Sequence, residues 1–270
     1  MRDEQDLKDA GYAPCLPCGE NCATSTLFAV LRKSQDLRII RLLLARGADP
    51  AERVSVPGKW DWVQTTPLHE AAERGYVDAI AIFIETGTTK LDTRDIEDNT
   101  PLLLAAANGQ EEVVNMLLEG GAKPDSKNEM GFTPLMAAAY SGSEAVARLL
   151  ITKGVKIDAV DIYSYTALTY AAKRGNEDIV RLLLTRGAKS DIRTTVGKTA
   201  LALATSEGHD PVVRLLRTYV GYADSSVSIQ SVRSWRAESI ILTMPDRSPA
   251  RLQPRFLRTF LAGKGNQRAG

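Results

Sequence analysis

Short apolar runs recur along the middle of the chain, and charged residues interrupt them at helical spacing. The runs are DAIAIFI, EEVVNMLL, EAVARLLI, EDIVRLLL and DPVVRLL, which begin at residues 78, 111, 144, 177 and 210. This spacing puts the apolar residues on one face of a helix. A glycine follows each of the first four runs, at Gly87, Gly121, Gly154 and Gly187. Because glycine tolerates the left-handed backbone conformation, each run predicts a short amphipathic helix that ends at a glycine.

A second helix is predicted before each of these runs. A threonine followed two residues later by a leucine recurs every 33 or 34 residues, at Thr66, Thr100, Thr133, Thr166 and Thr199. A small pair such as Ala71 and Ala72 stands five and six residues after each threonine, and a glycine stands nine residues after it. The threonine hydroxyl can cap a helix, and the leucine begins its buried face. Each period therefore predicts a helix, a tight turn, a second helix and a loop.

These residues resemble the ankyrin repeat, which has a 33-residue period and the signature T-P-L-H. The full tetrapeptide occurs at Thr66–His69, and the units at Thr100 and Thr133 keep T-P-L. The units at Thr166 and Thr199 replace the proline with alanine. The resemblance implies an all-α solenoid of about six helix-turn-helix repeats with short hairpin loops, in which neighbouring repeats bury each other's apolar faces.

The repeats define the expected domain organisation. The ankyrin-repeat domain is predicted over 24–220, with repeats near 24–57, 66–99, 100–132, 133–165, 166–198 and 199–220. The first unit is degenerate, since its first helix near TLFAVLRK lacks both the signature and the glycine, which favours a polar-faced cap. Residues 1–23 are expected to form a flexible leader. Residues 221–270 are expected to form a mostly flexible basic tail, with eight Lys/Arg against three Asp/Glu.

The spacing between the first two repeats is longer than the 33-residue period. The extra residues fall in 51–64, which reads as a lengthened loop that carries Trp60 and Trp62. The two tryptophans either grip a ligand or cover the first repeats, and the second interpretation is favoured because a large aromatic side chain is usually buried on at least one side.

The resemblance implies a protein partner on the concave side, which the first helices and the loop tips line. Several positions there are apolar or aromatic where polar residues are expected, which is typical of binding hot spots. The candidate partner-binding residues are Trp62, Glu70, Ile96, Leu104, Met130, Tyr140, Ile162, Tyr163, Tyr170, Lys173, Arg174, Val196 and Leu203. The alternative is that they pack against their own loops and neighbouring helices.

Catalysis, cofactors and nucleic acid are not expected. The two histidines, His69 and His209, belong to the capping tetrapeptide and to a turn, and the chain has no G-x-S-x-G, Walker, H-E-x-x-H or dinucleotide-binding motif. The repeat region is net negative, whereas phosphate contacts need clustered Lys/Arg. No apolar run is long enough for a membrane span, and the start of the chain lacks a secretory pattern. A cytoplasmic or nuclear protein is therefore expected.

All three cysteines, Cys15, Cys18 and Cys22, lie in PCLPCGENC near the start of the chain. Three thiolates can supply three corners of a zinc site, but no fourth ligand lies nearby in the sequence. Redox or lipid modification is a second interpretation, and an incidental part of a flexible leader is the favoured one.

Two motifs stand out in the tail. RSPAR contains Ser248 before a proline and resembles a proline-directed phosphorylation site. Residues 254–262 have the pattern of a short basic amphipathic helix, which can dock on a partner, on a membrane surface or on the last repeat.

The expected function is that of a non-catalytic interaction scaffold or an adaptor and regulator, with transcription co-regulation among the roles that the resemblance implies. The alternative is a substrate-recruiting subunit of an enzyme complex such as a ubiquitin ligase. A metal or redox sensor centred on the cysteines is the least favoured interpretation.

Overall fold

The computed structural model describes residues 22–57, 62–87 and 90–223, and within these ranges it contains twelve helices and one two-stranded sheet. The first helices of the six repeats are α2 (Cys22–Lys33), α4 (Pro67–Arg74), α6 (Pro101–Ala107), α8 (Pro134–Ser141), α10 (Ala167–Arg174) and α12 (Ala200–Ser206). The second helices are α3 (Leu37–Ala45), α5 (Val77–Glu85), α7 (Glu111–Glu119), α9 (Glu144–Thr152), α11 (Glu177–Thr185) and α13 (Asp210–Ala223). The predicted all-α solenoid of about six helix-turn-helix repeats is confirmed.

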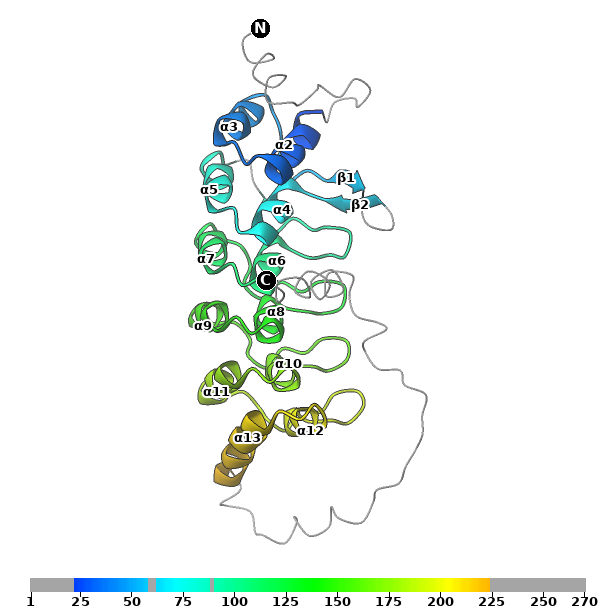
Figure 1. Cartoon of the computed structure of the whole chain (residues 1–270), viewed down its shortest axis with the longest axis vertical. Coiled ribbons are helices and arrows are strands. Elements are labelled where there is room, and N and C mark those ends of the chain that lie inside the picture. Colours follow the sequence, from blue (N-terminus) through cyan, green and yellow to red (C-terminus); the bar gives the residue numbers. More distant parts are fainter. Residues whose placement is uncertain (1–21, 58–61, 88–89, 224–270) are drawn as a thin grey trace, which may run out of the picture.

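The helices form two parallel columns, and the loops project from the column of first helices on the side away from the second helices (Figure 1). Each first helix packs on the first helix of the next repeat, and each second helix does the same within its own column. The glycines that follow α5, α7, α9 and α11 adopt positive φ angles, as the sequence predicts.

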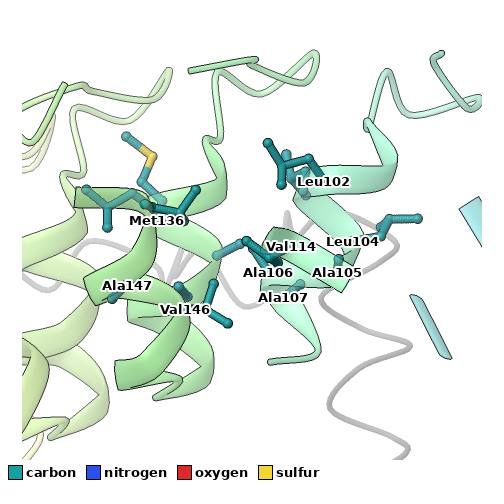
Figure 2. Close-up of a cluster of buried hydrophobic side chains, with 14 of the residues drawn as sticks. Leu102, Leu104, Ala105, Ala106, Ala107, Val114, Met136, Val146 and Ala147 are labelled. Carbon is teal, nitrogen blue, oxygen red and sulfur yellow. The ribbon is translucent and has the colours of Figure 1, made fainter. Parts of the chain in front are cut away.

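The core runs through the whole stack because every repeat contributes the same kinds of side chain. Figure 2 shows Leu102, Ala106 and Val114 of one repeat beside Met136 and Val146 of the next. These side chains are buried, and the alanines let neighbouring helices approach closely. Since a buried leucine or valine contributes about 1.5–3 kcal/mol to folding, stability comes from many contacts between neighbours.

The five signature threonines cap the first helices. Each Oγ1 accepts a hydrogen bond from the backbone N–H three residues later, at 3.2–3.3 Å. In the repeat with the full signature, His69 links the start of the first helix to the last residue of the same repeat. Its Nδ1 lies 2.8 Å from Thr66 Oγ1 and its Nε2 lies 2.9 Å from the carbonyl oxygen of Asn99. Both histidine nitrogens therefore have structural partners.

Where the sequence indicated a lengthened loop at 51–64, the described residues form two paired β-strands. Strand β1 (Val54–Pro57) pairs antiparallel with β2 (Trp62–Thr65), with Val54 opposite Thr65. Valine and threonine at these positions favour strands, and Val54 is buried. Trp62 pairs with Pro57 through its backbone, while its side chain and Trp60 lie outside the described residues.

Several predictions concern residues that the structure does not describe. The leader with Cys15 and Cys18, the tail with Ser248, the helix at 254–262 and the side chain of Cys22 all lie outside the described residues. In the part that is described, no helix is both long and apolar enough to cross a membrane. Nor do three His, Cys, Asp or Glu side chains of those residues gather where they could hold a metal ion.

Candidate partner-binding surface

The loop tips are built around one side chain that recurs in register. Asp95, Asn128 and Asp161 each use Oδ1 to accept hydrogen bonds from the backbone N–H groups two and four residues later, at 2.8–3.0 Å. The residue three positions after each of them has a positive φ angle, as Gly131 does at 75°. Each tip is therefore a tight turn with a fixed shape.

Hydrogen bonds also join consecutive loops to one another. The backbone N–H of Ile162 donates to the carbonyl oxygen of Met130 at 3.0 Å, and the N–H of Thr195 donates to that of Tyr163 at 3.0 Å. Gly131 is needed at this contact, because a Cβ atom there would lie 3.1 Å from Cα of Asp161. These bonds join the last three tips into a ladder, and the side chain of Asn128, whose Nδ2 donates to Asn99 Oδ1 at 2.9 Å, links the tip of Ile96 to it.

Three of the predicted partner-binding residues are well exposed on this ladder. The exposed fractions are 47% for Ile96, 54% for Ile162 and 70% for Val196. Met130 and Tyr163 occupy the same row and are half-buried. We use the term loop-facing surface for these five tip residues together with the first-helix side chains that point toward them.

Four other predicted residues are not available on that surface. Glu70, Leu104, Tyr140 and Leu203 are buried, so the exposure that the prediction assumed is wrong for them. The reason is the close stacking of the first helices, since Leu104 and Tyr140 belong to the continuous core. The packing alternative is the correct one for these side chains.

Two arginines hold the buried carboxylate of Glu70 in place. Its Oε1 lies 3.2 Å from Nε of Arg32 on α2 and 2.6 Å from Nε of Arg74 on its own helix. A buried carboxylate with two arginine partners ties the first two repeats together and is costly to disrupt.

An aromatic cluster joins the third, fourth and fifth repeats. The ring centroid of Tyr170 lies 5.1 Å from that of Phe132, 5.9 Å from that of Tyr140 and 5.0 Å from that of Tyr165. The Tyr170 hydroxyl donates a hydrogen bond of 2.6 Å to Asp161 Oδ2. Burial and the nearby Asp161 raise the pKa of Tyr170 above its usual value, so the hydroxyl keeps its proton.

Two cations of α10 rest on this cluster. Nζ of Lys173 lies 5.7 Å from the ring centroid of Tyr165, and Cζ of Arg174 lies 4.8 Å from that of Tyr140. Because Tyr170 precedes them by three and four residues, all three side chains share the helix face toward the loops. Lys173 is half-buried, which lowers its pKa, while Arg174 is exposed.

Sequence reasoning found Tyr140, Tyr170 and both cations but missed Phe132, Tyr165 and Asp161. The available signal was an aromatic residue directly before the signature threonine in two consecutive repeats. We name the set Phe132, Tyr140, Tyr165, Tyr170, Lys173 and Arg174 the cationic aromatic cluster.

Comparison with known families agrees with this architecture. The family described as "Ankyrin repeats (3 copies)" matches residues 26–128, 92–161 and 135–226. The chain belongs to the ankyrin-repeat family. Its ankyrin repeats are protein-interaction modules, in which stacked repeats present an extended surface to a partner.

The relatives with similar sequences are functionally diverse. The ankyrin-repeat chain is 31% identical over 84 residues to the E3 ubiquitin-protein ligase KEG of Arabidopsis thaliana, covering 31% of this chain and 5% of that protein. It is 30% identical over 93 residues to human ankyrin repeat and SOCS box protein 2, covering 34% and 14%. It is 30% identical over 114 residues to the human transient receptor potential cation channel subfamily A member 1, covering 40% and 9%. The similarity thus spans only a small part of each relative.

Proposed function

We propose that this ankyrin-repeat protein is a non-catalytic scaffold or adaptor that binds a partner protein on its loop-facing surface, in the cytoplasm or the nucleus. The observation that carries the proposal is the row of exposed apolar tips, Ile96, Ile162 and Val196, on a hydrogen-bonded ladder of loops. Exposed apolar side chains on a rigid support are favourable contact points, because binding them costs little conformational entropy.

The experiment is affinity purification of the full chain from cell extract, followed by mass spectrometry of the captured proteins. The variant Ile162→Ser/Val196→Ser removes two exposed anchors and leaves the core unchanged, so we expect the captured set to disappear while the melting temperature stays the same. Leu37→Ser is the matched control, since Leu37 is 37% exposed but lies on α3 in the other column. Unchanged capture by the double variant would refute the proposal.

A substrate-recruiting subunit of a ubiquitin ligase is the second candidate. It is favoured by the similarity to KEG, which is named as an E3 ubiquitin-protein ligase. The same purification separates the two roles, because a recruiting subunit would bring down ligase subunits that the Ile162→Ser/Val196→Ser variant still retains.

A further inference from the structure

Four other arginines on the described helices and loops are held differently from Lys173 and Arg174. Arg74, Arg94, Arg148 and Arg181 each form an ion pair with an acidic residue four positions away. Among the described residues, no carboxylate lies within ion-pair distance of Lys173 or Arg174. The faces of two tyrosine rings hold them instead.

A ring face positions a cation without neutralising it. The ring quadrupole attracts the cation and restricts its side chain, so less entropy is lost when an anion binds. The two cations are adjacent on one helix face, and the guanidinium of Arg174 can donate two parallel hydrogen bonds to a carboxylate. Lys173 is half-buried and its pKa is lowered by burial, so a bound carboxylate would also replace hydration that it has lost.

The acidic groups near the cluster do not cancel this charge. Asp161 is fully engaged, because Oδ1 accepts two backbone N–H groups and Oδ2 accepts the Tyr170 hydroxyl. Glu207 is exposed and raises the pKa of Lys173 from a distance. Lys198 is a further positive charge near Lys173 and lowers the same pKa. Lys173, Arg174 and Lys198 together outnumber the two carboxylates, so the local charge is positive and favours an acidic ligand.

We propose that the cationic aromatic cluster selects an acidic partner segment, whose aspartate or glutamate side chains bind Lys173 and Arg174. This inference rests on the proposed function and adds the chemistry of the partner. The loop that carries Ile162 also carries Tyr165, on whose ring Lys173 lies, so an apolar residue of the same segment reaches the tips. The basic tail of the chain is excluded as the occupant by its own charge.

The test is a selection from a displayed library of random peptides, with the full chain as bait. Enriched peptides are sequenced, and the binding of the strongest is measured by fluorescence anisotropy at low and high salt. We expect enrichment of Asp and Glu together with an apolar residue, and affinity that falls as salt screens the charges. Lys173→Glu/Arg174→Glu should weaken binding by about tenfold or more.

Two further variants separate charge from folding. Lys173→Gln/Arg174→Gln keeps the packing of both aliphatic stems and should also weaken binding, with an unchanged melting curve. Lys153→Glu/Arg186→Glu makes the same charge change at exposed positions after α9 and α11, and should alter affinity less than about threefold.

The outcomes distinguish this inference from the proposed function. Enrichment of neutral peptides that Ile162→Ser/Val196→Ser no longer binds would contradict the acidic partner and leave the scaffold proposal standing. Enrichment of no peptide would contradict both. The inference would also be overturned if Lys173→Glu/Arg174→Glu and Lys153→Glu/Arg186→Glu lost the same amount of peptide affinity. It would be overturned as well if a single-stranded DNA oligonucleotide bound more tightly than the peptides and its binding depended on Lys173 and Arg174.

Discussion

Asp161 organises its loop through two backbone contacts that an amide oxygen can also make, whereas its contact with the Tyr170 hydroxyl reverses direction in an amide, because the amide nitrogen donates. Its Oδ1 accepts from the backbone N–H groups of Tyr163 and Tyr165, and Asn128 accepts in the same way one repeat earlier. The negative charge is thus not required for the turn. Burial raises the pKa of Asp161 above its usual value, so the folded chain holds a proton on this carboxyl more strongly than the unfolded chain does.

Because of this raised pKa, the contribution of Asp161 to the free energy of unfolding falls as the pH rises. The stabilising effect of protonated Asp161 is fully present below its unfolded pKa, about 3.9, and is lost as pH rises through the higher folded value. We therefore expect Asp161→Asn to equal the wild type in acid and to be at least as stable at neutral pH. Urea unfolding at a series of pH values measures this difference.

Asp161→Ala is the control for the loop contacts. It leaves the backbone N–H of the buried Tyr165 without its acceptor, so the free energy of unfolding should fall by about 1–3 kcal/mol at every pH. If Asp161→Asn lost as much as Asp161→Ala, the charge itself would hold the loop and the amide equivalence would be wrong.

At the scale of the elements, neighbouring repeats interlock at the turn between the two helices. Gly175 ends α10 with φ at 73°, and a Cβ atom there would lie 2.6 Å from Nδ1 of His209. Nε2 of His209 lies 3.0 Å from the carbonyl oxygen of Lys173. The turn of the fifth repeat is therefore covered by a side chain of the sixth, which explains why a histidine stands there.

Replacing Gly175 with alanine should cost more than the backbone strain alone. Gly187, after α11, has φ at 84° and open space around its missing Cβ atom, so Gly187→Ala measures strain without contact, about 1–2 kcal/mol. Gly175→Ala adds a clash with His209. It should therefore lower the free energy of unfolding by clearly more than Gly187→Ala does. Urea unfolding of both variants gives the comparison, and equal losses would show that the interlock contributes nothing.

For the whole molecule, the sequence predicted the fold more completely than the surface. A 33-residue period with capped helices determines a stack in which each repeat touches only its neighbours, so local pattern is enough. Whether Leu104 or Leu203 is exposed depends on how closely adjacent helices approach, and periodicity does not report that distance. The cationic aromatic cluster joins residues from three repeats, so only its separate parts were visible in the sequence.

The same nearest-neighbour principle predicts that position in the stack sets the cost of a core mutation. The signature leucine is buried in the interior repeats, as Leu168 is, but Leu201 of the last described repeat is only partly buried, because no further repeat among the described residues covers it. Leu168→Ala should therefore lower the free energy of unfolding by about 2–5 kcal/mol, and Leu201→Ala by roughly half of that or less. Both variants replace leucine with alanine at the same position of a first helix, so the atoms removed and the change in helix propensity are the same in the two variants. Guanidinium unfolding of the full chain measures both losses, and an equal loss would mean that residues beyond 223 cover the end of the stack as completely as a repeat does.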